Sequence, residues 1–273
     1  MPEPSDETLI ASARQGNAHA LESLIARHQD RVYRYAIKLC RNPDDAQEVL
    51  QETMLSLAKG LADFREEAAL TTWLYTVARS HCIKLHRRSK FAPLELESLE
   101  ADDAPTPSAD ARTDPEMATA AREVDEALQL AIDALDDTSR EVLVLRDVEG
   151  LTATEVAKVM GTSSAAVKSR LHRARLTVRE SMVPLLQPRV APATTQPCPD
   201  ALTLLSKDLE GEIDAMTCAE LEAHLATCET CDDACQTLRK TLALCGAAQR
   251  SVAVPTAVQA SVRVALREFL ASA

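Results

Sequence analysis

The sequence predicts an all-helical protein made of small domains. Glycine is scarce, with 6 of 273 residues, aromatic residues make up only 3%, and alanine, leucine and valine dominate. That composition favours periodic helices over strands. Two proline-dotted breaks divide the chain, and the first is also acidic. We therefore expect a helical domain at 5–90, an acidic linker at 91–115, a helical domain at 116–183, a proline-rich linker at 184–197 and a cysteine-rich body at 198–273.

The net charge of −12 is distributed unevenly along the chain. Residues 21–90 carry more basic than acidic side chains, whereas residues 91–120 and 191–273 are acidic. Acidity outside the basic segments limits non-specific adhesion to nucleic acid. The sequence has neither an apolar run long enough to cross a membrane nor a signal peptide at its start. We therefore expect a cytoplasmic protein that does not bind membranes.

Residues 151–175 have the pattern of two short helices joined by a glycine turn. Thr152 and Glu155 form a predicted capping box, Gly161 provides the left-handed residue between the helices, and Ser163 is a candidate N-cap for the second helix. This layout is typical of a DNA-reading helix-turn-helix. Five basic side chains of the second helix are expected to face phosphates and bases, namely Lys168, Arg170, His172, Arg173 and Arg175.

A helix is predicted to start at Asn42, because Asn42 can cap it and Pro43 suits its first position. Two acidic residues in the first turn interact favourably with the positive end of the helix dipole. Its apolar side chains share one face, and the opposite face is polar. From these residues alone, that polar face is either a binding surface or the solvated side of an ordinary amphipathic helix.

Residues 64–88 combine aromatic and basic side chains. Stacking on aromatic rings and cations along the backbone are the means by which proteins hold unpaired nucleic-acid strands. The candidates are Phe64, Trp73, Tyr75, Arg79, Lys84, Arg87 and Arg88. The alternative interpretation is that Trp73 and Tyr75 belong to the hydrophobic core.

Three segments, at 45–54, 71–88 and 142–175, together resemble bacterial sigma factors of the extracytoplasmic-function (ECF) group. The resemblance implies a sigma-2 and a sigma-4 domain that recruit core RNA polymerase to promoter DNA. It places the polymerase contact on Asp45, Glu48, Gln51 and Glu52, and reading of the −10 element on residues 64–88. Reading of the −35 element falls to residues 163–175, which adds Ser163, Ser164 and Ser169 to the cations named above.

Six of the eight cysteines lie in the last 76 residues, which in a cytoplasmic protein indicates metal or redox chemistry. His224 and Cys228 lie one helical turn apart, and Cys231 follows in a two-residue knuckle. A tetrahedral metal needs one more ligand. Residues 198–231 resemble the zinc-binding anti-sigma fold, and this resemblance implies Cys198 as the fourth ligand.

Cys218, Cys235 and Cys245 exceed the needs of a structural zinc site and are candidate additional ligands, although Cys245 could be a core residue. Cys40 and Cys82 are expected to be core residues or bystanders. Excess thiolates suit Cu(I), Cd or Zn. A sigma factor with a fused cysteine-rich tail resembles the CorE-like metal-dependent sigma factors, which implies that a transition metal switches the sigma domains in cis, by activation or by silencing.

Three alternatives remain at this stage. Thiol oxidation could replace metal as the signal, with zinc bound in the tail, or the chain could be a helix-turn-helix regulator that never binds polymerase. An enzyme is disfavoured, because no phosphate loop or nucleophile with its base is present.

The amphipathic segment at 255–270 has one apolar face, made of Val258, Val262, Leu266, Phe269 and Leu270. It could dock on the sigma domains or complete the tail's own core.

Overall fold

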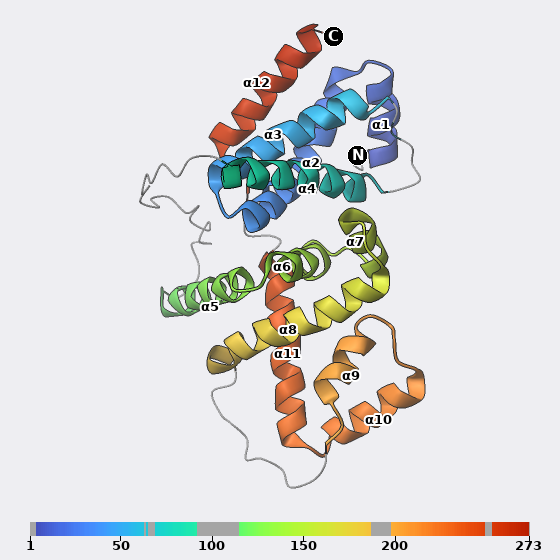
Figure 1. Cartoon of the computed structure of the whole chain (residues 1–273), viewed down its shortest axis with the longest axis vertical. Coiled ribbons are helices and arrows are strands. Elements are labelled where there is room, and N and C mark those ends of the chain that lie inside the picture. The colour runs from blue at the N-terminus through green and yellow to red at the C-terminus, as the bar shows by residue number, and fades with distance from the viewer. Residues whose placement is uncertain are drawn as a thin grey trace. The chain divides into compact units, whose positions relative to one another are not determined.

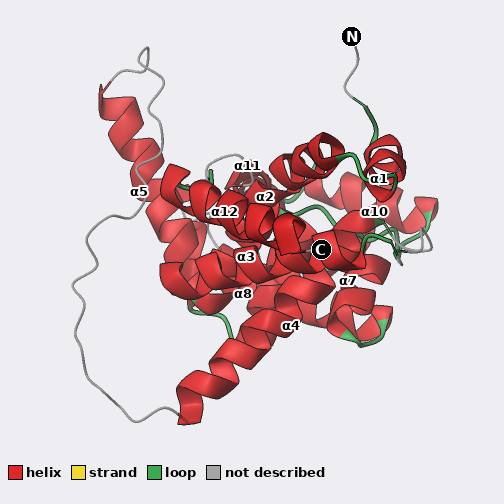
Figure 2. Ribbon diagram, turned by 90° about the horizontal axis from the view of Figure 1, so that it is seen from above, coloured by secondary structure: helices red, strands yellow, loops and turns green. Residues whose placement is uncertain are grey.

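The computed structural model describes residues 4–62, 64, 69–91, 115–186, 198–248 and 253–272, and among these the secondary structure is helical throughout (Figures 1 and 2). No strand occurs in these ranges, as the all-helical prediction required. Contacts divide the chain into two compact units. The first contains α1–α4 and α12, and the second contains α5–α11, with residues 158–161 at the end of α7 grouped with the first.

The first unit is built on three long helices. The bounds are α1 (Asp6–Arg14), α2 (Ala18–Cys40), α3 (Pro43–Gly60), α4 (Leu70–Phe91) and α12 (Thr256–Ser272). Helices α2, α3 and α4 pack against one another. Asn42 caps α3 as predicted, because its side-chain oxygen accepts from the amides of Asp44 at 2.8 Å and Asp45 at 3.5 Å. The apolar face of α3 is buried, which leaves its polar side chains on the opposite side.

Helix α12 docks on α3, so the amphipathic end of the chain packs with the helices of the first unit and does not complete the core of the tail (Figure 1). Val258, Val262 and Leu266 are buried there, while Leu270, expected on the same face, is 40% exposed. Lys59 of α3 lies 5.7 Å from the ring centre of Phe269. The cysteine-rich body is thus shorter than the expected 198–273.

The second unit begins with the helices that lead into and form the helix-turn-helix. Their bounds are α5 (Pro115–Asp133), α6 (Asp137–Leu143), the π-helical turn η1 (Val144–Val148), α7 (Ala153–Met160) and α8 (Ser164–Leu186). Helix α8 continues past Pro184, three residues beyond the expected end of the domain. The π-helical turn was not predicted. It keeps Val144, Leu145 and Val148 in the core, and it also contains Arg146 and Asp147.

The predicted turn chemistry of the helix-turn-helix is present. The amide of Thr152 donates to the Glu155 carboxylate at 2.8 Å, and the amide of Glu155 donates to the Thr152 hydroxyl at 3.3 Å. Gly161 adopts φ of +65°, and the Ser163 hydroxyl accepts from the amide of Ala166 at 3.2 Å. These local interactions set the direction in which α8 leaves α7.

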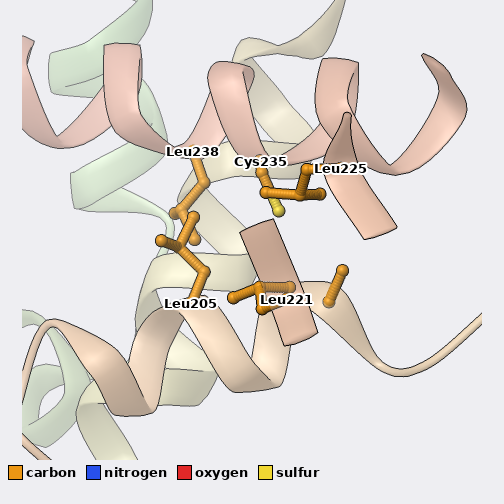
Figure 3. Close-up of a cluster of buried hydrophobic side chains, with 6 residues drawn as sticks. Leu205, Leu221, Leu225, Cys235 and Leu238 are labelled. Atoms are coloured by element: carbon orange, nitrogen blue, oxygen red, sulfur yellow. The ribbon is translucent and has the colours of Figure 1, made fainter. Parts of the chain in front are cut away.

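The cysteine-rich part of the second unit contains α9 (Ala201–Asp208), α10 (Ala215–Leu225) and α11 (Glu229–Ala247). The three helices share a small core made of Ala201, Leu205, Leu221, Leu225, Cys235 and Leu238 (Figure 3). Helix α11 also packs along α8 and η1. The same helix therefore completes this core and joins it to the helix-turn-helix.

None of the helices in the described part of the chain is both long and apolar enough to span a bilayer.

Candidate metal centre and nucleic-acid interface

Four of the predicted metal ligands come together at one end of the cysteine-rich helices. The ligand atoms of Cys198, His224, Cys228 and Cys231 all lie within 4.8 Å of one another. Cys198 precedes α9, His224 lies in the last turn of α10, and the other two cysteines are at the start of α11. Three thiols and an imidazole thus converge here from the residues before α9, the end of α10 and the start of α11, as the spacing of the motif and the resemblance had implied.

The turn between α10 and α11 orients two of these ligands. The amide of Cys228 donates to the carbonyl of His224 at 2.9 Å, which closes the end of α10. Cys228 is the N-cap of α11. A hydrogen bond from the backbone amide of Cys231, in the first turn of α11, lowers the pKa of the Cys228 thiol. The thiolate, the form that binds metals, is thereby favoured at Cys228.

The geometry fits a tetrahedral metal ion. Two sulfur ligands of one zinc ion, each about 2.3 Å from it, lie about 3.8 Å apart. The sulfurs of Cys198 and Cys228 are separated by 3.7 Å. The Nε2 atom of His224 is buried and has no hydrogen-bond partner within the described residues. Burial, followed by the neighbouring Cys198 and Cys228, raises the pKa of Cys231 to about 12. A dication would give the imidazole a partner and favour the thiolates.

The structure does not bring the other three candidate ligands to this cluster. Cys235 has no exposed surface and points into the core beside Leu225 and Leu238 (Figure 3). Cys245 is also fully buried, further along α11. Cys218 is half-buried on α10 and outside the four-residue group. Cys235 and Cys245 therefore act as small core residues, a correction to their assignment as ligands, and no described geometry supports Cys218 as one.

The DNA-facing candidates on α8 differ in exposure. Ser163, Ser169 and Arg173 are exposed, and Ser164, Lys168, Arg170 and His172 are partly exposed. Arg175 is a correction, because it is only 2% exposed and binds the Asp147 carboxylate through two nitrogens at 2.6 and 2.9 Å. A bidentate buried ion pair holds the guanidinium inside the unit. Arg175 is thus a structural residue of the helix-turn-helix, and it does not project towards DNA.

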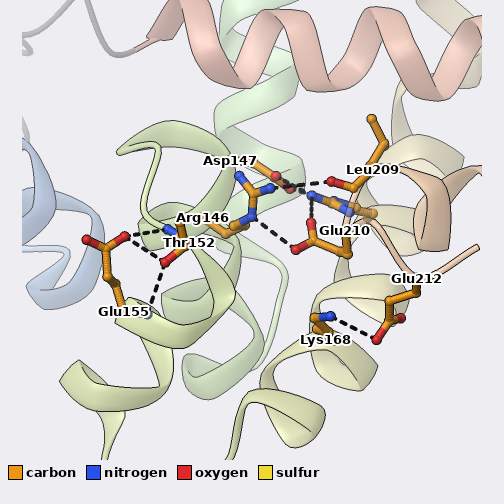
Figure 4. A network of polar contacts seen from close by, with 9 residues as sticks. Arg146, Asp147, Thr152, Glu155, Lys168, Leu209, Glu210 and Glu212 are labelled. Carbon is orange, nitrogen blue, oxygen red and sulfur yellow. Dashed lines mark hydrogen bonds and ion pairs between the residues drawn. The ribbon is translucent and has the colours of Figure 1, made fainter.

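Polar side chains of the cysteine-rich part contact this basic helix directly (Figure 4). Glu210 accepts from Arg175 at 2.9 Å and from Arg146 at 3.2 Å, and its side chain is only 5% exposed. Glu212 pairs with Lys168 at 3.0 Å. The Arg175–Glu210 and Lys168–Glu212 partners lie 35 and 44 residues apart in sequence, so no local sequence pattern indicates these contacts.

A third contact of the same kind lies on α9. The Thr203 hydroxyl is 3.3 Å from Nε2 of His172. Further along α8, Arg179 donates to the carbonyl of Ala234 on α11 at 3.0 Å. Three side chains predicted to face DNA, those of Lys168, His172 and Arg175, therefore have partners in residues 203–212.

The polymerase-contact candidates on α3 lie together on its polar face. Glu48 is exposed, and Asp45, Gln51 and Glu52 are partly exposed. Asp44, Gln47, Glu48, Gln51 and Glu52 line a shallow open hollow of about 350 Å³. An acidic, open surface of this kind suits a basic protein partner.

The −10 candidates separate into core and surface residues. Tyr75 is fully buried and packs edge-on against Tyr35 with ring centres 5.1 Å apart, so it cannot stack on a base. Phe64 is 8% exposed and packs against Trp73, which keeps part of its surface exposed. Arg79 is partly exposed on α4, Lys84 and Arg87 are exposed, and the side chain of Arg88 lies outside the described residues. Tyr75 is therefore corrected to a core residue.

Comparison with known families gives three matches in the order expected. Sigma-70 region 2 matches residues 24–91, and sigma-70 region 4 matches residues 125–178. Residues 198–231 match a third family, whose description is "Putative zinc-finger". The third range contains all four residues of the metal-suited cluster.

Individual relatives agree with these matches. The ECF RNA polymerase sigma factor SigM of Mycobacterium tuberculosis is 33% identical over 174 residues, which cover 63% of this chain and 82% of the relative. The RNA polymerase sigma-H factor of Pseudomonas aeruginosa is 27% identical over 191 residues, covering 68% and 98%. Among solved structures, CnrH in complex with the cytosolic domain of CnrY is 27% identical, with a TM-score of 0.47, and the match covers 64% and 95%. The two sigma-70 matches, with 33% identity to SigM over 82% of that relative, show that the chain belongs to the ECF family of RNA polymerase sigma factors, which are transcription initiation factors and not enzymes, and which bind core RNA polymerase and promoter DNA.

Proposed function

We propose that this sigma factor responds to a transition metal, and that its cysteine-rich region switches promoter recognition in cis. The observation that carries the proposal is a set of contacts to the helix-turn-helix from the same small body that holds the Cys/His cluster. Glu210 and Glu212 make two of them (Figure 4), and Thr203 makes the third. We call residues 203–212, which supply these three side chains, the latch.

The latch occupies side chains that promoter DNA would need. A phosphate approaching Lys168 meets the carboxylate of Glu212, and one approaching His172 meets Thr203. Acidic side chains repel phosphates as well as occupying their cationic partners. We therefore infer that α8 reads the −35 element poorly while the latch is in place, and that the exposed Arg173 and Ser169 alone do not restore full binding.

Helix α9 connects the metal-suited cluster to the acidic end of the latch, which carries Glu210 and Glu212. Cys198 lies three residues before the first residue of α9, and Glu210 lies two residues after its last. Eight helical residues span about 12 Å, so a shift at one end of this short rod reaches the other. A metal bound by Cys198 fixes the start of α9. Metal occupancy would thereby bias the position of Glu210 between latched and released arrangements.

The four ligands assemble in the same arrangement in which the latch is closed. A metal that prefers tetrahedral Cys₃His coordination, zinc above all, would therefore stabilise the latched form. Soft metal ions such as Cu(I) and Cd also bind thiolates. We propose that such metals compete for Cys198, Cys228 and Cys231 and change promoter recognition, which would make this chain similar in behaviour to the CorE-like factors.

The remaining surfaces have separate proposed roles. We assign core-polymerase binding to the polar face of α3 that includes Asp45, Glu48, Gln51 and Glu52. We assign −10 reading to the surface of α4 with Arg79, Lys84 and Arg87, where Trp73 is the aromatic side chain that remains available. Neither surface includes a latch residue.

Transcription with purified components tests the proposal. Holoenzyme made with the full-length chain would first select promoters from a random DNA pool. Run-off transcription from a selected promoter would then be measured with metal-free protein and after titration with zinc, copper or cadmium. We expect zinc to lower initiation and a double variant, Cys228→Ala with Cys231→Ala, to ignore zinc. Metal control would be refuted if the wild type initiated equally well without metal and with each of the three metals.

The same assay separates metal control from thiol oxidation. A peroxide titration of the zinc-loaded protein, followed by transcription and by a colorimetric assay of released zinc, measures the redox response. If peroxide changes initiation at concentrations where added metals have no effect, the tail is a redox switch.

A further inference from the structure

A pair of cysteines outside the tail lies inside the first unit. Cys40 is the last residue of α2, and Cys82 is in the middle of α4. The two side chains are 6% and 2% exposed, and their sulfurs are 2.9 Å apart. Neither belongs to the metal-suited cluster, and the functional surfaces assigned above do not use them.

The distance between these sulfurs distinguishes two kinds of cysteine chemistry. Two ligands of one tetrahedral zinc lie about 3.8 Å apart, and bonded sulfurs of a disulfide lie about 2.05 Å apart. Cys198 and Cys228, at 3.7 Å, have the metal separation. Cys40 and Cys82 are too close to share a zinc ion, and a gap of less than about 1 Å separates them from bonding distance. Small rotations of two side chains close such a gap.

We propose that Cys40 and Cys82 form a site of reversible oxidation, at which a peroxide converts the two thiols into a disulfide between α2 and α4. The thiolate of one cysteine attacks a peroxide oxygen, the O–O bond breaks, and the departing hydroxide is protonated to water, which leaves a sulfenic acid. The second thiol then attacks that sulfur, the S–S bond forms, and a second water leaves. Two thiols and one hydrogen peroxide thus give one disulfide and two water molecules.

The bond would join two residues 42 positions apart in sequence and close a loop that contains all of α3. Cross-linking residues so distant in sequence restricts the unfolded chain, so the oxidised unit resists unfolding. It would also fix α4, which presents Arg79, Lys84 and Arg87, against α2. The inference concerns the sigma-2 helices alone and does not depend on metal control by the tail.

Peptide mapping of the full-length protein tests the site. The protein would be treated with hydrogen peroxide, alkylated, digested with trypsin and analysed by mass spectrometry. Cleavage after Lys38, Arg41, Arg79 and Lys84 isolates both cysteines on short peptides. We expect residues 39–41 linked to residues 80–84, lighter than the separate peptides by two hydrogen atoms, and separated again by dithiothreitol.

Two controls keep the outcome specific. A variant with Cys198→Ser, Cys228→Ser and Cys231→Ser should still form the link, which distinguishes this site from the tail. The midpoint of thermal unfolding of the first unit should rise by roughly 10 °C on oxidation of the wild type and stay unchanged in Cys40→Ser. Oxidation of the exposed Cys198 shows that the peroxide treatment has worked. The proposal is wrong if Cys40 and Cys82 are then both still alkylated as free thiols. It is also wrong if either of them is linked to a tail cysteine. The reversal by dithiothreitol in the wild type keeps the test valid if Cys40→Ser does not fold.

Discussion

Two surfaces proposed to contact the transcription machinery differ in what covers them. The polar face of α3 lines an open hollow, and α12 docks on α3 through apolar side chains without occupying that hollow. The basic helix α8, in contrast, has Lys168 and Arg175 in ion pairs with acids from the cysteine-rich region. This difference is the basis of our proposal that the tail acts on DNA reading and not on polymerase recruitment.

The proposed selectivity of the tail for α8 rests on charge. The turn after α9 carries Glu210 and Glu212, and both carboxylates match cations of the helix-turn-helix. On α3 the accessible face is itself acidic, so an acidic turn would be repelled there. The apolar face of α12 finds a partner on the opposite, apolar side of the same unit. The comparison predicts that variants of the tail alter promoter binding, and that variants of α3 alter polymerase binding.

The largest effect is expected from removing metal ligands. Cys228→Ala combined with Cys231→Ala removes two of four ligands, and metal binding in such small sites supplies much of the folding free energy. The latch should then open, and the affinity of the holoenzyme for a selected promoter should rise by roughly 100-fold. Fluorescence anisotropy measures the promoter affinity, and mass spectrometry under native conditions should show loss of the bound zinc. Unchanged promoter affinity after verified loss of zinc would contradict the link between cluster and latch.

A smaller effect is expected from Glu210→Gln. This side chain is 5% exposed and binds two arginines, so neutralising it removes the charged partner of Arg146, which is 26% exposed, and one of the two carboxylates that pair with the buried Arg175. We expect promoter affinity to rise by roughly 10- to 30-fold, with polymerase binding unchanged. Glu220→Gln, at an exposed position on α10, is the matched control and should behave as the wild type. Equal effects of both variants would show that total charge matters and the latch does not.

On the other side of the comparison, charge reversal of the α3 face should act on polymerase alone. Glu48→Lys with Glu52→Lys should weaken binding of core polymerase by about 10-fold, because basic side chains now face a basic partner. Surface plasmon resonance with immobilised core enzyme measures the change. The zinc response of these variants should be that of the wild type, and a lost zinc response would mean that the two surfaces are not independent.

The smallest effect is expected from Glu212→Gln. Its ion pair with Lys168 joins side chains that are 37% and 25% exposed, and water and salt screen such pairs. We expect promoter affinity to rise by about 3-fold at low salt and hardly at all at high salt. A salt series of anisotropy titrations distinguishes this result from a direct contact of Glu212 with DNA, which would keep the effect at high salt.

Local sequence signals predicted local structure well. The capping box at Thr152, the glycine at 161 and the cap at Asn42 each act within four residues, and all three are present. The spacing of His224, Cys228 and Cys231 likewise placed three ligands together, because one turn between two helices sets their geometry.

What the sequence did not reveal depends on distant partners. Arg175 looked like one more cation of a basic helix, and only the fold shows Asp147 and Glu210, 28 and 35 residues away in sequence, on either side of it. Tyr75 and Cys235 have polar or reactive groups that suggest a function. In the fold, however, each side chain points into a hydrophobic core that residues from other helices help to form. Cys40 and Cys82 are likewise distant in sequence, and only the fold brings their sulfurs together.

The most direct test compares promoter affinity with and without zinc in two versions of the full-length protein. Holoenzyme with wild-type chain, zinc-loaded or stripped by a chelator, is compared with holoenzyme carrying Glu210→Gln and Glu212→Gln. Latch control predicts that stripping raises the promoter affinity of the wild type by at least about 10-fold, and that the double variant binds tightly in both states. If the wild type and the double variant respond to zinc equally, or if stripping weakens promoter binding of the wild type, the latch does not control promoter reading.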